Sequence, residues 1–156
     1  KGLAKGSYIY LQNIITDLLI GMKRFDIIER FVTSCLKLGY RPGLITLNPV
    51  ILDREIREFE KTVLQDLIVC FNINAEGFNV FPSLNTLEEF IESEHDYQLM
   101  GMSIFASGAA NISKSIEFIK KLKLDYVVFG TSRIENVKSN MELLRNWIRH
   151  PLNDIF

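Results

Sequence analysis

Small, hydroxyl-bearing and glycine residues follow two apolar segments near the carboxyl end of the chain, in residues 103–108 and 130–132. Glycine lets a phosphate group approach the backbone closely, and the N–H groups at the start of a following helix favour negative charge. Arg133 can add a charge-assisted hydrogen bond to such a group. The alternative is that both segments are ordinary strand-to-helix turns with helix caps. The candidate phosphate-binding residues are Ser103, Ser107, Gly108, Gly130, Thr131 and Ser132.

Polar residues also follow the earlier apolar segments, and most of them are neutral hydrogen-bonding groups. They are Gln12, Asn13, Asp17, Asn48, Asn72, Asn74 and Glu76. The set holds neither a serine–histidine–acid combination nor an obvious metal-binding cluster. Glu76 is either a mobile acid or base or a solvated loop acid, and the second interpretation is favoured. We expect His95 on the surface and His150 at the periphery.

Composition limits the possible classes of protein. The chain has 156 residues, of which 47% are hydrophobic, enough for one domain with a substantial core. A net charge of -1 gives no electrostatic reason to expect nucleic acid or a membrane surface as partner. No apolar segment approaches the roughly 20 residues of a membrane-spanning helix. Cys35 and Cys70 lie in apolar stretches, which predicts buried free thiols and a cytoplasmic location.

Strand patterns alternate with helix patterns along the whole chain, which is typical of parallel βα units. Five strands are expected at residues 7–14, 42–48, 66–72, 98–105 and 126–129. Five helices are expected at residues 25–38, 53–63, 87–93, 111–122 and 134–148, the third capped by Asn85 or Thr86. Residues 74–83 are expected to form a longer loop.

These units predict an α/β fold, and two architectures are open. The favoured one is an incomplete TIM-type (βα)8 barrel with about five of its units present, since a complete barrel needs about 250 residues. The alternative is a five-stranded doubly wound parallel sheet. We expect one domain over residues 7–149, a linker or stray segment at 1–6 and a tail at 150–156, the whole being a fragment of a longer protein. Open sheet edges predict self-association.

The order of these features resembles the carboxyl-terminal part of the aldo-keto reductase family, a (βα)8 barrel that reduces carbonyls with a nicotinamide dinucleotide. Residues 8–12 look like its fourth strand, and residues 38–48 are similar to its passage into the fifth. Residues 102–108 and 129–132 look like the loops after the seventh and eighth strands. The resemblance implies that Asn48 contacts the nicotinamide, and that the remaining cofactor contacts come from Ser103, Ser107, Gly108, Gly130, Thr131, Ser132, Asn136 and Asn140.

Two departures from the family pattern bear on catalysis. The family's catalytic histidine corresponds to Gln12, which can hydrogen-bond a carbonyl but cannot relay a proton. Its catalytic aspartate, tyrosine and lysine come from the first three strands, which this sequence does not contain. Asn136 stands where some members carry a basic residue for the extra phosphate of NADP, so both NADP and NAD are open.

The sequence therefore predicts a reductase-like barrel protein that binds a phosphorylated small molecule and lacks most of its catalytic residues. Two alternatives remain. One is another phosphate-binding barrel enzyme of the aldolase or isomerase type, for which Asp17 and Glu76 are the nearest acids. The other is a non-catalytic α/β module that assembles with a partner chain.

Overall fold

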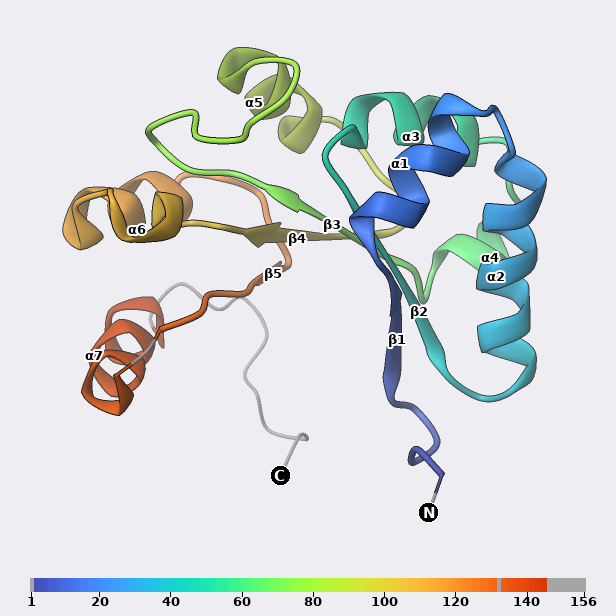
Figure 1. The fold of residues 1–156 in the computed structure, drawn as a ribbon, viewed down its shortest axis with the longest axis horizontal. Helices are drawn as coiled ribbons and strands as arrows, with labels where there is room; N and C mark the ends of the chain where they lie inside the picture. Colours follow the sequence, from blue (N-terminus) through green and yellow to red (C-terminus); the bar gives the residue numbers. More distant parts are fainter. Residues whose placement is uncertain (1, 132, 146–156) are drawn as a thin grey trace.

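Five parallel strands form a single sheet in the computed structural model, which describes residues 2–131 and 133–145 (Figure 1). The strands lie side by side in chain order, β1-β2-β3-β4-β5. They are β1 (Tyr8–Leu11), β2 (Arg41–Thr46), β3 (Ile68–Asn72), β4 (Gln98–Met102) and β5 (Tyr126–Val127). The α/β class is therefore confirmed, and the five-stranded parallel sheet fits the doubly wound alternative.

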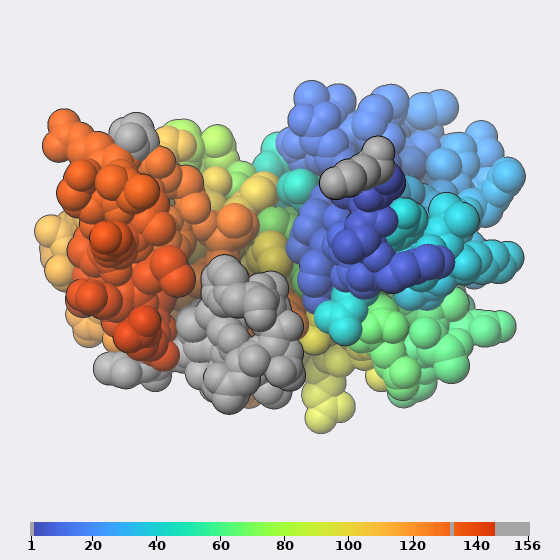
Figure 2. Space-filling model, turned by 90° about the horizontal axis from the view of Figure 1, so that it is seen from below, coloured from blue at the N-terminus to red at the C-terminus, as the bar shows by residue number. Residues whose placement is uncertain are grey.

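The connections between the strands are mostly helical. The helices are α1 (Asn13–Gly21), α2 (Phe25–Lys37), α3 (Pro49–Ile56), α4 (Lys61–Leu64), α5 (Leu84–Glu92), α6 (Ile112–Lys120) and α7 (Ile134–Arg145). Figure 1 shows α1 to α4 grouped around β1 and β2, and α6 and α7 near β4 and β5. In the space-filling view the N-terminal elements and α7 lie on opposite sides of the molecule (Figure 2).

The core lies between the central strands and the helices. β3 is buried along its whole length, as its continuous apolar sequence predicts. On α2 the buried side chains Ile28, Val32 and Cys35 follow each other at helical spacing and form the face that packs inward. Leu44 of β2 is fully buried in the same core.

Side chains of β1 reach across the other face of the sheet, opposite the face on which Leu44 lies. We call the face that carries Tyr10 and Gly43 the inner face. The Tyr10 ring lies over Gly43 of β2, where an added Cβ would collide with the ring. The Tyr10 hydroxyl is 3.8 Å from Met100 Sδ on β4. β1 and β4 are three strand spacings of about 4.8 Å apart, and side chains stand nearly perpendicular to a sheet. This contact therefore requires a strongly curved sheet.

Tyr8 of the first strand affects the titration of Tyr126 of the last strand. Burial, and then the charge and hydrogen bond of the Tyr8 hydroxyl, raise the pKa of Tyr126. Tyr8 begins β1 and Tyr126 begins β5, so the two residues belong to the first and last strands of the sheet. Arg41 donates to the Tyr8 hydroxyl at 2.9 Å and closes this polar layer at the amino-terminal ends of the strands.

The structure corrects several predicted boundaries. The first strand ends at Leu11 rather than at residue 14. The Gln12 carbonyl accepts the first N–H bonds of α1, a helix that was not predicted because its first residues are β-branched. Residues 53–63 are not one helix, because α3 begins earlier, at Pro49, and ends at Ile56 before the separate α4. Ser83, rather than Asn85 or Thr86, caps α5 through the Thr86 N–H.

The remaining predicted elements correspond closely to the structure. Residues 25–38, 42–48, 66–72 and 111–122 match α2, β2, β3 and α6 within a few positions. Strands β4 and β5 are shorter than predicted, because the chain leaves each ladder early to form a loop. The last predicted helix matches α7 up to Arg145, and residues 146–148 lie outside the described residues. None of the described helices is both long and apolar enough to cross a membrane.

We expect Gly43→Ala to destabilise the fold by about 1–3 kcal/mol, because its methyl group would displace the Tyr10 ring from the inner face of the sheet. Urea denaturation measures the effect. Gly21→Ala is the matched control, since nothing lies within 4 Å of a Cβ at Gly21 and alanine favours a helix. Equal free energies of unfolding for the two variants would contradict the expectation.

Candidate functional site

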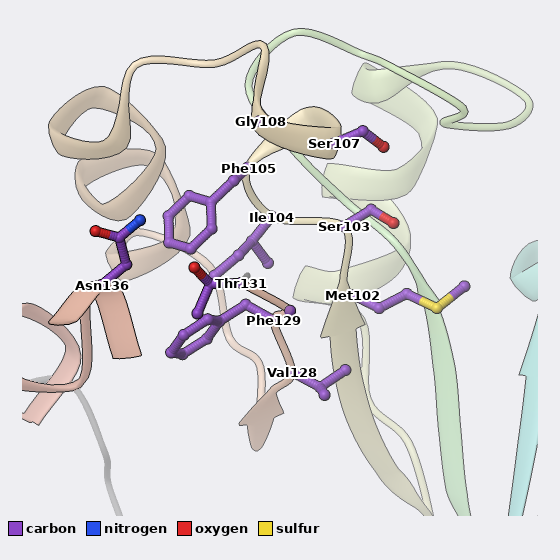
Figure 3. Close-up of a pocket in the computed structure, with 11 residues that line it drawn as sticks. Met102, Ser103, Ile104, Phe105, Ser107, Gly108, Val128, Phe129, Thr131 and Asn136 are labelled. Atoms are coloured by element: carbon purple, nitrogen blue, oxygen red, sulfur yellow. The ribbon is translucent and has the colours of Figure 1, made fainter. Parts of the chain in front are cut away.

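A pocket of about 750 Å³ opens between the loops that follow β4 and β5. Figure 3 shows the lining side chains, which come from these two loops and from the first turn of α7. All of the lining residues are uncharged. They are Met102, Ser103, Ile104, Phe105, Ser107, Gly108, Val128, Phe129, Gly130, Thr131 and Asn136.

The loop after β4 has an unusual backbone. Ser103, Ala106, Ser107 and Gly108 all have positive φ angles, of 58°, 46°, 56° and 88°. Such angles are uncommon at residues other than glycine, and they gather at functional sites. Two turn hydrogen bonds of 2.8 Å hold the loop in this form, from Ala106 N–H to Ser103 O and from Gly108 N–H to Phe105 O.

This conformation leaves backbone donors available at the pocket. The N–H groups of Ser103, Phe105 and Ser107 donate to no protein acceptor within residues 2–131 and 133–145. Successive N–H groups in left-handed or turn conformations form concave sites that bind anions. The loop can therefore bind an anionic group through its backbone without a cationic side chain.

Two phenylalanines, one from each loop, form an apolar wall of the pocket. The Phe105 and Phe129 rings are 5.6 Å apart between centroids, at an interplanar angle of 68°. Figure 3 shows the two rings on the same side of the loop backbone, near Thr131 and Asn136. An edge-to-face pair of this kind offers a surface for a planar ring.

The loop after β5 leads directly into α7. Asn136 lies in the first turn of α7, and its N–H donates to the Arg133 carbonyl at 3.1 Å. The Thr131 hydroxyl accepts a long bond of 3.4 Å from Arg133 N–H, which helps to set the start of the helix. The Arg133 side chain is exposed and does not line the pocket.

The structure brings together six of the residues that the sequence predicted as cofactor contacts. Ser103, Ser107, Gly108, Gly130, Thr131 and Asn136 all line the pocket. Asn140, two turns into α7 in the sequence, is buried and does not line it. Ser132 lies outside the described residues.

Gln12 and Asn48 lie apart from this pocket. Gln12 is exposed at the end of β1, where it precedes α1. Asn48 lines a smaller cavity of about 330 Å³ with Leu47, Asn79, Val80 and Phe81. The predicted nicotinamide contact and the predicted phosphate contacts are therefore on different loops of the same sheet edge.

Asp17 has a structural partner rather than a free carboxylate. It accepts hydrogen bonds from the Thr46 hydroxyl at 2.5 Å and from Leu47 N–H at 3.0 Å. The Thr46 oxygen in turn accepts from Asn48 N–H at 2.8 Å. This chain of bonds ties α1 to the carboxyl end of β2 and fixes the backbone of Asn48.

Asn72 and Asn74 are similarly used by the long loop after β3. The Asn72 amide donates to the Asn79 carbonyl at 3.0 Å. The Asn74 side chain donates to the Phe78 carbonyl and accepts from Phe78 N–H, both at 2.9 Å. Both side chains thus hold the loop after β3, and Glu76 is an exposed residue of this loop.

Sequence reasoning missed the apolar half of the pocket. Phe105 and Phe129 each precede the small residues of their loop, and this repeated position was the available signal.

No family model, curated protein or solved structure matches the chain. The site is therefore interpreted from its geometry.

The sequence predicted His95 on the surface, and this prediction is wrong for its side chain. Its side chain is only 5% exposed, because it packs beside Asp53 of α3. Together with Tyr97, which comes directly before β4, these residues form a second cluster at the amino-terminal end of that strand.

We expect Thr46→Val to lower the free energy of unfolding by about 1–3 kcal/mol. Thr46 is fully buried, and valine keeps its shape while removing the oxygen that joins Asp17 to the Asn48 backbone. Urea denaturation of this variant is compared with that of Thr62→Val, an exposed position on α4. A loss no larger than that of the exposed variant would show that this link does not stabilise the fold.

Proposed function

We propose that the chain is the carboxyl-terminal part of an aldo-keto-reductase-like (βα)8 barrel and that its pocket binds a nicotinamide dinucleotide, NADP or NAD. One observation carries the proposal. Two loops at the carboxyl ends of adjacent strands form one neutral pocket with free backbone donors and an aromatic wall.

The barrel part of the proposal is supported by strand order and curvature. The strands are parallel and lie in unbroken chain order, which is the arrangement of strands in such a barrel. The inner face is curved enough for Tyr10 to meet Met100. β1 and β5 are the edge strands among the described residues, and further units would pair there.

The pocket suits a dinucleotide in size and chemistry. Its volume of about 750 Å³ lies within the usual range of about 300–1,000 Å³ for small-molecule sites. Free N–H groups near Ser103 and Ser107 suit the diphosphate, while Phe105 and Phe129 suit a base. Asn136 and Thr131 supply neutral hydrogen-bonding groups between these two parts.

Proton transfer requires groups from outside the pocket, because none of its described lining residues titrates near neutral pH. Gln12 can orient a carbonyl but holds no exchangeable proton of suitable acidity. In the proposed protein the proton donor therefore comes from strands that precede β1 in the family. Cys35 and Cys70 are buried free thiols, which supports the proposed cytoplasmic location.

Isothermal titration with NADPH, NADH, ADP and inorganic phosphate tests the proposal. Gly130→Leu should weaken dinucleotide binding, because Gly130 lines the pocket and the larger side chain would take up part of its volume. Gly21→Leu is the control, since its environment is equally open and it does not line the pocket. We expect at least a tenfold weaker affinity for Gly130→Leu and no change for Gly21→Leu.

The same titration separates the alternatives. Binding of phosphate alone, lost in Gly130→Leu, would favour a phosphate-binding barrel of the aldolase or isomerase type. No heat of binding with any of the four compounds at millimolar concentration would reject a ligand site and favour a non-catalytic module.

A further inference from the structure

A second cavity, of about 440 Å³, shares no lining residue with the first pocket. It is bordered by α3, α4 and the segment that leads into β4. Unlike the first pocket, it is lined mainly by charged side chains. The lining residues are Asp53, Arg57, Lys61, Leu64, Glu94, His95, Asp96 and Tyr97.

One nitrogen of His95 faces oxygen atoms that need a donor. Nε2 is 2.8 Å from the Phe90 carbonyl, which can only accept hydrogen bonds. Nε2 is also 3.2 Å from the Ser93 hydroxyl, whose own proton goes to the same carbonyl at 2.7 Å. Nε2 must therefore carry a hydrogen atom.

The other nitrogen faces a carboxylate. Nδ1 is 3.4 Å from Asp53 Oδ1, which is an ion-pair contact without the alignment of a full hydrogen bond. Nδ1 is buried and has no hydrogen-bond partner among the described residues. A neutral ring with its hydrogen on Nε2 would hold a lone pair against this carboxylate, away from solvent. A second hydrogen, on Nδ1, turns that repulsion into attraction.

Asp53 is ionised in this setting. Burial alone would raise the pKa of Asp53, but its contact with His95 and the hydrogen bonds from Arg57 and Tyr97 outweigh burial and lower the pKa to about 2. The Tyr97 hydroxyl donates to Oδ1 at 2.5 Å, and Arg57 Nε donates to Oδ2 at 2.8 Å. The carboxylate facing His95 is thus negatively charged throughout the physiological pH range.

Two aromatic rings flank the imidazole. The Phe90 and Tyr97 ring centroids lie 4.7 Å and 5.0 Å from that of His95. Both rings are tilted relative to the imidazole, at interplanar angles of 60° and 49°, and they pack beside a side chain that is only 5% exposed.

We propose that His95 is doubly protonated in the folded protein and forms a pH-sensitive clamp between residues 93–97 and α3. Loss of the proton leaves two acceptors in contact and releases the segment that forms one wall of the cavity. The other charged and titratable groups around the ring are Asp53 and Arg57 from α3, Lys61 from α4, and Glu94, Asp96 and Tyr97 from the segment itself.

The clamp gives stability a definite pH dependence. A histidine in an unfolded chain loses its proton near pH 6.5. Because the folded protein keeps this proton, the clamp contributes its full stability below about pH 6.5, and that stability is lost as the pH rises to the point where the folded protein releases the proton. Histidine is the side chain best suited to such a change near neutral pH.

Nitrogen-15 NMR of the imidazole at pH 7.5 tests the protonation state directly. The chain has two histidines, so the His150→Gln variant leaves His95 as the only signal. We expect both ring nitrogens to show protonated shifts. A neutral ring with hydrogen on one nitrogen at pH 7.5 would overturn the proposal.

Two variants connect this signal to Asp53. In the His150→Gln background, Asp53→Asn should convert His95 to the neutral form at pH 7.5. Tyr97→Phe removes a hydroxyl from the same carboxylate but keeps its charge, and should leave the ring doubly protonated. A charged ring in Asp53→Asn, or a neutral ring in Tyr97→Phe, would contradict the assigned pairing. If Asp53→Asn does not fold, the parent and Tyr97→Phe spectra still decide the question.

Urea denaturation between pH 6 and pH 8 supplies the second measurement. In the His150→Gln background we expect the unfolding equilibrium constant to rise roughly tenfold over this interval, since the folded state holds a proton that the unfolded chain releases. Adding His95→Gln should remove most of this rise. A parent whose stability is constant or increases over the interval would refute the clamp.

Discussion

The packing of Tyr10 across the inner face of the sheet is the constraint on which the rest of the structure depends. Its ring occupies the space that a side chain at position 43 would take, and its hydroxyl meets Met100 two strands beyond. Burial, followed by nearby Cys70 and tyrosine hydroxyls, raises the pKa of Tyr10 to about 12, so the group stays neutral there. The contact with Met100 therefore joins β1 to β4, the strand that leads into one of the pocket loops.

The polar residues at the carboxyl ends of the strands divide into two groups with different roles. After β2 and β3, buried polar side chains such as Thr46 and Asn74 form hydrogen bonds within the protein and hold the loops in one conformation. After β4, the left-handed backbone leaves N–H groups at Ser103 and Ser107 without protein partners. Unsatisfied donors beside an open pocket are costly unless water or a ligand accepts from them. The β4 loop, rather than the polar loops before it, therefore has the backbone donors that the proposed ligand would need.

Sequence patterns predict the features that depend on local composition. β3 could be predicted from its continuous apolar segment and α2 from its apolar stripe, without knowledge of distant contacts. The glycine-containing loops predicted most of the polar residues of the pocket. Features that depend on distant partners could not be predicted. His95 follows two glutamates and looks solvated in the sequence, yet Asp53 and two aromatic rings bury it. The predicted first strand ran on to Ile14, into the first turn of α1, because residues 7–14 are rich in β-branched and aromatic side chains. The buried Leu19 and Ile20 instead favour a helix there.

The two cavities differ in the charge of their lining residues: the first is lined by uncharged side chains and the second mainly by charged ones. At the carboxyl edge, backbone dipoles can stabilise an anion, so an anion can be bound there without a charged side chain. Such a site has no side-chain charge for salt to screen. Around Asp53 the charges belong to side chains, and burial makes each depend on its partners. Removal of a single proton from His95 would therefore leave the carboxyl-edge pocket unchanged while weakening the contact between α3 and residues 93–97. Under the two proposals, ligand binding and pH response therefore belong to separate parts of the structure.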